Sequence, residues 1–356
     1  MKKLFFLLVM VFAASIVMAQ TNKSVIIESG TNQTSTVDQQ GEDNESLIEQ
    51  SNKKNEATVT QINYLLVDDD AGDANYSEVM QSGKRNDANV TQIHDRSEPY
   101  AGPGGVLEAY ITQTGDDNLA EQFQGPHHQM GASVATIEQG GDNNVALQMQ
   151  VKYSNEATIL QSGNLNTAKQ AQDTKLPDDY VGSSNTALIN QSGNKNWAEQ
   201  EQHGWANEVT ALQSGNRNEA YQTQAVASWK SVAFVEQTGN DNDAWQDQLG
   251  HKNSGTITQA SGSNIAMQDQ TSLAGQPGDF VNEAIISQLG GNGNTANQTQ
   301  TNLFEMGKNY AIITQDGSSN FASQEQVGAI NWSSVSQTGS GHSATVTQSQ
   351  SIIQLP

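Results

Sequence analysis

One repeat fills most of this chain and limits its fold more than any other feature. Fixed residues recur with a period of 22 positions, arranged as two halves of seven residues plus four. Thirteen copies follow one another, and a period of this length is typical of a solenoid. The clearest copy consists of Asn155, Ala157, Ile159, Gln161, Gly163, Asn166, Ala168, Gln170 and Gln172.

Glutamine closes both halves of nearly every copy. The first-half glutamines are Gln50, Gln81, Gln113, Gln139, Gln161, Gln191, Gln213, Gln237, Gln259, Gln288, Gln315 and Gln337, with Glu28 in the first copy. The second-half glutamines are Gln39, Gln61, Gln92, Gln124, Gln150, Gln172, Gln202, Gln224, Gln248, Gln270, Gln300, Gln326 and Gln348. The departures are small: Asn52 and Ser261 replace the turn glycine, Gln33 and His342 replace the second asparagine, and the copy around Gly290 has one extra residue.

The spacing predicts the local structure of each copy. Seven residues that alternate between fixed and variable positions indicate a β-strand with one buried face. The four residues between the halves contain glycine in eleven of the thirteen copies, which indicates a tight turn. A single strand-turn-strand copy is too small to bury its own face. We therefore expect an all-β, amyloid-like β-solenoid of about thirteen 22-residue strand-turn-strand repeats, with two facing parallel sheets.

Extra residues interrupt the repeat only after the second-half glutamine. The insertions lie near 62–74, 93–106, 125–132, 173–184, 225–230, 271–281 and 301–308. We expect all of them to leave the same edge of the solenoid, as insertions between repeats do. The predicted organisation is a signal peptide at 1–19, the repeat solenoid at 20–348 and a short tail at 349–356.

Large and small residues are expected to face each other across the core. If two strands of a copy face each other, Ile159 opposes Ala168 and Ala157 opposes Gln170. The four copies with valine at the Gln170 position have serine at the Ala157 position, and the other nine pair glutamine with alanine, glycine or valine. Contact explains this correlation, although shared duplication history also produces one. Buried amides are costly when unpaired, but identical amides one strand apart can bond along the axis.

Residues 1–19 have the features of an export signal. Lys2 and Lys3 precede an apolar run, and Val17-Met18-Ala19 predicts cleavage between Ala19 and Gln20. No later run has the ~20 apolar residues that a spanning helix needs. The first copy begins soon after this site and only a short tail follows the last copy, so we expect no capping element at either end.

Composition excludes several classes of protein. A formal net charge of -23 disfavours general nucleic-acid binding, because phosphate backbones attract basic surfaces. The absence of cysteine excludes disulfides, thiolate metal sites and cysteine nucleophiles. No Ser-His-Asp or phosphate-loop motif is visible, and no paired carboxylates recur in a pocket position. We therefore expect no enzymatic activity and no cofactor.

Three local motifs have a functional and an ordinary interpretation. Residues 68–73 (DDDAGD) resemble a calcium loop but lack the glycine and the distal glutamate of an EF-hand, which favours a solvated acidic loop. The pair His127-His128 has no third ligand at a useful spacing, which favours a polar loop over a metal site. Trp197, Trp245 and Trp332 fall at outward positions, where they are either plain surface or stacking platforms for sugars or a second filament.

The pattern Asn/Ser-x5-Gln-x-Gly-x-x-Asn-x-Ala-x3-Gln resembles the curlin repeat of curli subunits, which build bacterial functional amyloid. Asn or Ser opens twelve of the thirteen copies, with Leu107 as the exception. The resemblance implies a secreted, cell-surface fibre subunit, a dedicated outer-membrane secretion pore and a nucleator subunit as partners, and roles in adhesion and biofilm matrix. The copy number, the insertions and the high acidity depart from the common short form, which leaves open a major subunit, a nucleator or a specialised adhesin.

Two functions of different classes follow from this reading. The first is a structural subunit that polymerises by stacking the end of one solenoid on the end of the next, because unpaired edge strands template further strands. The second is a monomeric secreted solenoid that binds glycans or a surface partner through its loops. An ice-binding solenoid is disfavoured, since the outward positions form no regular threonine ladder.

Overall fold

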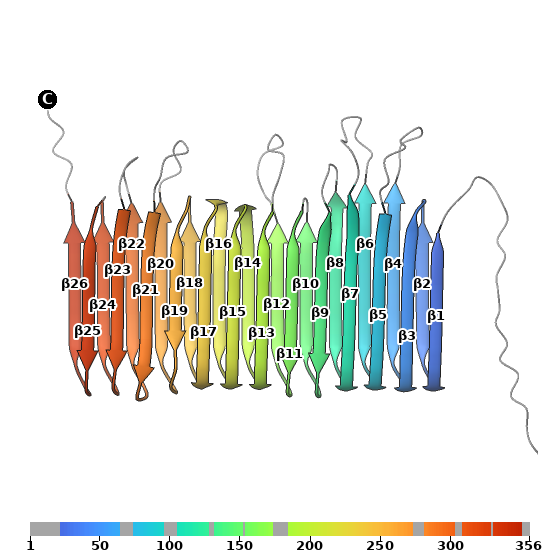
Figure 1. Cartoon of the computed structure of the whole chain (residues 1–356), viewed down its shortest axis with the longest axis horizontal. Coiled ribbons are helices and arrows are strands. Elements are labelled where there is room, and N and C mark those ends of the chain that lie inside the picture. Colours follow the sequence, from blue (N-terminus) through green and yellow to red (C-terminus); the bar gives the residue numbers. More distant parts are fainter. Residues whose placement is uncertain are drawn as a thin grey trace, which may run out of the picture.

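The computed structural model describes residues 22–64, 74–95, 105–127, 132–151, 154–173, 184–272, 281–302, 308–328 and 330–350. Every regular element in these ranges is a β-strand. Figure 1 shows the strands side by side along the long axis of the molecule, with the first and last strands at opposite ends. None of the described residues forms a helix that is long and apolar enough to cross a membrane.

The strands form two sheets of thirteen strands each, ordered as in the chain. The odd-numbered sheet contains β1 (Lys23–Thr31), β3 (Asn44–Lys53), β5 (Ala74–Lys84), β7 (Val106–Asp116), β9 (Ser133–Gly140), β11 (Glu156–Ser162), β13 (Thr186–Asn194), β15 (Glu208–Asn216), β17 (Val232–Asn240), β19 (Ser254–Gln259), β21 (Val281–Gly290), β23 (Lys308–Asp316) and β25 (Trp332–Thr338). The even-numbered sheet contains β2 (Thr34–Gln40), β4 (Glu56–Tyr64), β6 (Asp87–Asp95), β8 (Leu119–His127), β10 (Val145–Val151), β12 (Thr167–Asp173), β14 (Trp197–Trp205), β16 (Glu219–Trp229), β18 (Asp243–Leu249), β20 (Ile265–Ser272), β22 (Thr295–Asn302), β24 (Phe321–Val327) and β26 (Ser343–Ser349).

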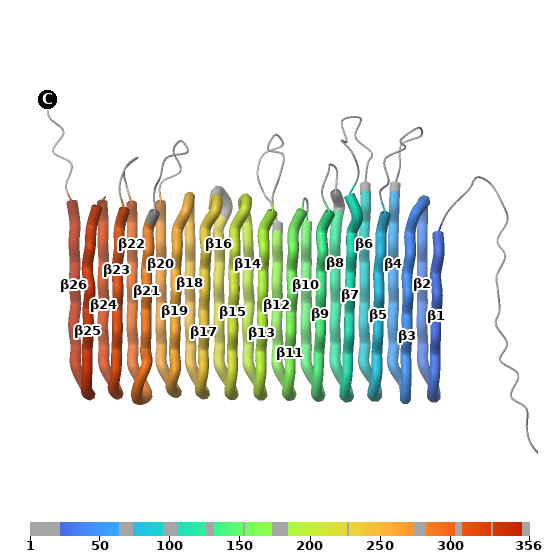
Figure 2. The backbone as a smooth tube through the Cα atoms, viewed as in Figure 1, coloured from blue at the N-terminus to red at the C-terminus, as the bar shows by residue number. Residues whose placement is uncertain are grey.

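Each odd-numbered strand and the even-numbered strand after it form one turn, so that turn 1 is β1 and β2 and turn 13 is β25 and β26. Neighbouring strands within a sheet are parallel, and equivalent positions stack directly: Ala157 pairs with Ala187, and Gln161 pairs with Gln191. The tube in Figure 2 shows the backbone passing repeatedly between the two sheets. The predicted all-β solenoid with two parallel sheets is confirmed. The extra residue near Gly290 appears as a register shift between Gln288 and Gly290.

The connection from each odd-numbered strand to the next even-numbered strand is here called the arch. The predicted turn glycine adopts positive φ, with a φ of +101° at Gly193. A second position, directly before the asparagine that recurs in the arches, also has positive φ, for example 59° at Lys195 and 56° at Arg217. The sequence pattern did not reveal this second position, because its residue type varies.

Stacking places a further restriction on the arch glycine. A Cβ atom added to Gly193 would lie 2.0 Å from the carbonyl oxygen of Gly215 in the next turn. Asn52 takes this position in turn 2 with a φ of 78°. Glycine is therefore favoured both by backbone conformation and by the close approach of successive arches.

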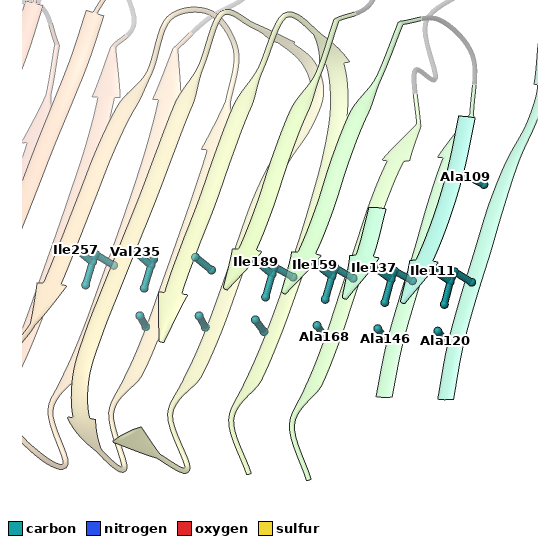
Figure 3. Packing of buried hydrophobic residues seen from close by; sticks show 14 of the residues in the cluster. Ala109, Ile111, Ala120, Ile137, Ala146, Ile159, Ala168, Ile189, Val235 and Ile257 are labelled. Atoms are coloured by element: carbon teal, nitrogen blue, oxygen red, sulfur yellow. The ribbon is translucent and has the colours of Figure 1, made fainter. Parts of the chain in front are cut away.

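The core between the sheets is narrow and combines large with small side chains. Figure 3 shows a row of isoleucine and valine side chains, including Ile137 and Ile159, beside a row of alanines that includes Ala146 and Ala168. These four residues are 0 % exposed. Alternating large and small residues fill such a thin layer at the density of a protein interior.

The long connections follow even-numbered strands. Of the seven predicted insertions, only 225–230 lies fully within the described residues, where β16 is prolonged to Trp229 and its pairing shifts register between Gln202 and Gly204 of β14. Most residues of the insertions near 62–74, 93–106, 125–132, 173–184, 271–281 and 301–308 lie outside the described ranges. The signal peptide, its cleavage site at Ala19 and Gln20, and residues 351–356 of the tail also lie outside them.

Candidate functional site: amide ladders and the two terminal turns

A continuous ladder of hydrogen bonds joins the first-half glutamines. The Nε2 of each glutamine donates to the Oε1 of the next, with 2.9 Å between Gln161 and Gln191 and 2.8 Å between Gln191 and Gln213. The ladder runs without interruption from Gln50 to Gln337. Each Nε2 also donates across the core, as Gln191 does to the Thr167 carbonyl oxygen at 3.0 Å. These buried amides are thus paired by the stacking of identical residues.

The second-half glutamines form a parallel ladder through all thirteen turns. Gln172 donates to Gln202 at 2.8 Å, and the series extends from Gln39 to Gln348. In both ladders the donor always lies in the earlier turn and the acceptor in the later one. The solenoid therefore has a hydrogen-bond direction, from the N-terminal turn towards the C-terminal turn.

A third ladder occupies only the middle of the solenoid. Gln170 accepts from Gln148 at 2.9 Å and donates to Gln200 at 3.0 Å, and the series runs from Gln122 to Gln324. Val90 precedes it and Val346 follows it in the same sheet. The buried Gln122 Oε1 has no hydrogen-bond partner, because valine supplies no donor at the previous position. Valines thus confine this ladder to turns 4–12.

The small residue opposite this third ladder lies within contact distance of it. Gly255 replaces alanine in turn 10, and a Cβ atom built there would lie 2.9 Å from the Oε1 of Gln268. Turn by turn, Gly255 corresponds to Ala157 and Gln268 corresponds to Gln170. This geometry explains why alanine or glycine faces a glutamine of this ladder in every turn except turn 8, where the residue is Val209.

Exchange of this facing pair tests the contact. We expect Gln170→Val and Ala157→Ser each to lower the free energy of unfolding by about 1–3 kcal/mol, because each leaves a buried polar group without a partner. The double variant recreates the Ser/Val pair of turns 1–3 and 13 and is expected to cost less than the sum, with a coupling energy of about 0.5–3 kcal/mol. Urea denaturation of the four proteins measures this coupling. Strict additivity would show that the two side chains do not interact.

The asparagines serve the arch rather than a simple amide ladder. Asn166 Nδ2 donates to the Ser162 carbonyl at 3.3 Å and to the Gly193 carbonyl of the next turn at 2.9 Å. Its Oδ1 accepts from the backbone N–H of Asn196 at 3.0 Å. The expectation of stacked amides is therefore incomplete for asparagine, whose main partners are backbone groups of two successive arches. Asn155 similarly accepts from the backbone N–H of Asn185 at 3.3 Å.

Stacked acids mark the outer surface. Asp243 aligns with Glu219, and Asp269 aligns with Asp247. Partial burial first, and these like charges second, raise the pKa of Asp243 and of Asp269. A raised pKa means that the folded chain binds these protons more readily than the unfolded chain. The solenoid therefore gains stability from these groups as pH falls towards the raised pKa and loses it as pH rises.

Outward tryptophans pack against their neighbours along the axis. Trp245 stacks on Tyr221 with 5.9 Å between ring centroids, and Lys169 lies 4.7 Å from the centre of the Trp197 ring. Trp332, in turn 13, is 65 % exposed. No group of three or more histidine or carboxylate side chains within the described ranges is placed to hold a metal ion. The acidic segment 68–73 and His128 lie outside those ranges, and nothing is described of the His127 side chain.

The two terminal turns expose residues that are buried in every inner turn. Ile26 in β1 is 45 % exposed, whereas Ile48 directly beside it is 0 % exposed. At the other end Val346 and Gln348 of β26 are half-buried, whereas Gln324 and Gln326 beside them are buried. The outer faces of turns 1 and 13 thus present core residues and one edge of each sheet.

The pattern of the last turns identifies a known repeat. Residues 308–349 match the curlin associated repeat. The match spans β23 to β26, which are turns 12 and 13, and it confirms the resemblance for these residues. No curated protein matches the chain. Turn 12 carries the curlin residues Asn309, Ala311, Ile313, Gln315, Gly317, Asn320, Ala322, Gln324 and Gln326 at the positions that Asn155 to Gln172 occupy in turn 6.

The family model matches only these last two turns, and the other described turns share their strand arrangement. Together, the curlin repeat and the β-solenoid indicate a curli-like amyloid subunit. The curlin repeat family is structural, which is consistent with the expectation that this chain is not an enzyme.

Proposed function

We propose that this protein is the secreted structural subunit of a curli-like cell-surface amyloid fibre. Subunits stack end to end, so that turn 13 of one copy packs on turn 1 of the next and both sheets continue across the junction. The fibre core would then consist of the columns that include Gln161, Gln172 and Gln191. The fibre acts in adhesion and in the biofilm matrix.

The match between the two terminal turns carries this proposal. Turn 13 has Ser333 and Val346, and turn 1 has Ser24 and Val37 at the equivalent positions, whereas turns 4–12 have glutamine in the valine column. In an end-to-end stack, turn 13 therefore joins turns 1–3 into one uninterrupted Ser/Val block. The third glutamine ladder, which Val90 and Val346 bound within each subunit, is left unchanged by this junction. A monomeric solenoid provides no physical reason for its two ends to match.

Backbone geometry supports the same arrangement. The strands are parallel throughout, their register shifts only near Gly290, Gly204 and His94 among the described strands, and β1 and β25 lie at opposite ends of their sheet. An edge strand offers unpaired N–H and C=O groups to a further strand of the same kind. A second copy in the same orientation continues the pairing without a change in register.

The proposed location and partners follow from the curlin repeat. Export by the predicted signal peptide, passage through an outer-membrane pore and start of assembly on a nucleator subunit are part of this proposal. The boundaries 1–19, 20–348 and 349–356 belong to it as well.

Fibre formation by the mature chain tests the proposal. We expect purified protein to form fibres whose diffraction shows the ~4.7–4.8 Å strand repeat. Growth should accelerate from low to physiological salt, because a strongly acidic chain, with a formal net charge of -23 over all 356 residues, makes subunits repel one another and salt screens this repulsion. Electron microscopy, fibre diffraction and seeded growth assays provide the measurement. A protein that stays monomeric after seeding with its own sonicated material would exclude the proposal.

A groove on the even-numbered sheet favours the second candidate, a monomeric adhesin for glycans or a surface partner. It has a volume of about 600 Å³, and its lining includes Phe123, Met149 and Lys169. Apolar and charged side chains together suit the faces and hydroxyls of sugars. Glycan binding by protein that remains monomeric would favour this candidate over the fibre.

A further inference from the structure

Turn 1 departs from the inner turns at two positions that touch each other. Glu28 occupies the first-half position where the other twelve turns have glutamine, and Ser35, on the other strand of the turn, occupies a position where the other twelve have alanine. Ser35 Oγ donates a hydrogen bond to Glu28 Oε1 at 2.7 Å and lies 3.1 Å from Gln50 Oε1. The two replacements thus form one local unit on the exposed outer face of the solenoid.

Replacement of glutamine by glutamate at position 28 changes the number of hydrogen-bond donors in the ladder. In the inner turns each first-half glutamine donates to the next, as Gln50 does to Gln81 at 2.7 Å. An ionised Glu28 has no proton to donate to Gln50 Oε1, and the single hydroxyl proton of Ser35 must serve two acceptors. A protonated Glu28 supplies the missing donor to Gln50 and keeps a carbonyl oxygen as acceptor, so it can take the place of glutamine in the side-chain ladder. It lacks only the second N–H, which each inner glutamine donates to a backbone carbonyl across the core, as Gln191 does to Thr167.

The opposite end of the molecule carries the complementary donors. Gln337 Oε1 accepts from Gln315, and its Nε2 donates to the Phe321 carbonyl at 2.8 Å, which leaves its second N–H without a partner among the described residues. Gln348 likewise donates to the Trp332 carbonyl at 2.8 Å. An incoming turn 13 would place Gln337 against Glu28 and Gln348 against Gln39.

We propose that Glu28 and Ser35 form a proton-controlled docking site for the C-terminal turn of a second copy of this chain. The inference rests on the proposed fibre function. Docking would place Glu28 between two neutral amides, Gln50 of its own chain and Gln337 of the incoming copy. Glu28 would then be as enclosed as Gln50, which is 0 % exposed. Enclosing an unpaired carboxylate in such a core is strongly unfavourable, whereas the protonated form fits without a charge. Glu28 therefore slows stacking when ionised and permits it when protonated.

No other charged side chain shares the inward face with Glu28. Lys23 of β1, Asp38 of β2, and Glu45 and Glu49 of β3 alternate onto the outward faces of their strands. The strands and arch of turn 13 contribute one titratable side chain, His342, whose position corresponds to Gln33 and not to Glu28. Glu28 is thus the ionisable side chain that turn 1 contributes to the inward face of the junction.

A double substitution removes the dependence of docking on the protonation of Glu28 while preserving the amide ladder. Glu28→Gln with Ser35→Ala recreates the glutamine and alanine found at these positions in the other twelve turns. Glu49→Gln is the matched control, because it removes the same charge from an exposed, outward position on the neighbouring strand. Elongation of each protein on its own sonicated fibres is followed by sedimentation and thioflavin fluorescence between pH 5 and 8 at fixed ionic strength. Circular dichroism of the monomers checks that all variants fold alike.

We expect the elongation rate of the natural protein to fall as pH rises, by up to about tenfold per pH unit once protonation limits docking. The double variant should lose this dependence and elongate near pH 7 at the rate that the natural protein reaches in acid. Glu49→Gln should retain the dependence. Equal behaviour of the double variant and Glu49→Gln would overturn the inference, as would slower elongation of the double variant near pH 7. Absence of fibres for every protein at every pH would instead exclude the proposed function itself.

Discussion

Replacing Gly141 with alanine is expected to lower the free energy of unfolding by about 3–5 kcal/mol. Gly141 has a φ of +94°, and an added Cβ would lie 2.2 Å from the carbonyl oxygen of Gly163 in the next arch. Both the strained backbone conformation and the overlap with a backbone atom oppose alanine. The neighbouring turn cannot yield without losing its own register.

Gly140→Ala is the matched control one residue earlier. Gly140 does not have positive φ, and a Cβ there would meet Thr114 Oγ1 at 3.5 Å, an ordinary contact. We expect this change to stay within about 0.5 kcal/mol. Urea denaturation of freshly prepared monomers, followed by circular dichroism, measures both effects. Comparable losses for the two variants would mean that the arch tolerates a side chain at Gly141.

Replacing Gln191 with leucine is expected to cost about 3–5 kcal/mol of unfolding free energy. The side chain of Gln191 accepts from Gln161 and donates to Gln213 and to the Thr167 carbonyl, with all three distances between 2.8 and 3.0 Å. Leucine fills similar space but removes three bonds and leaves buried polar atoms on both sides of the gap. Each such atom costs about 1–3 kcal/mol.

Asn190→Leu provides the control on the same strand. Asn190 is exposed on the outward face and pairs in register with Leu160 and Leu212. Leucine there completes an outward row of three leucines, so we expect a change within about 0.5 kcal/mol. The same denaturation assay compares the two variants. A small effect of Gln191→Leu would contradict the view that the ladder stabilises the core.

The alternation of residues such as Ala157, Ile159 and Gln161 was enough to predict the strands, the buried face and the parallel stack. It could not show the direction of the amide bonds, which depends on the side-chain orientation that all turns share. The contact of Asn166 with two successive arches was also hidden, because spacing alone does not distinguish amide partners from backbone partners. The conformation at Lys195 left no trace in residue type. Glu28 was visible as an exception, but its contact with Ser35 required the fold.

The placement of every long connection after an even-numbered strand has a consequence for the proposed fibre. Thirteen strands spaced about 4.7–4.9 Å apart make each subunit about 60 Å long. The arches repeat with the short strand spacing along one side, whereas each insertion recurs once per subunit along the other. The fibre would therefore carry two periodicities on two different sides. The insertions can therefore change in length or sequence during evolution without disturbing the arches, whose close spacing fixes how the turns stack. They would lie along the fibre as widely spaced segments.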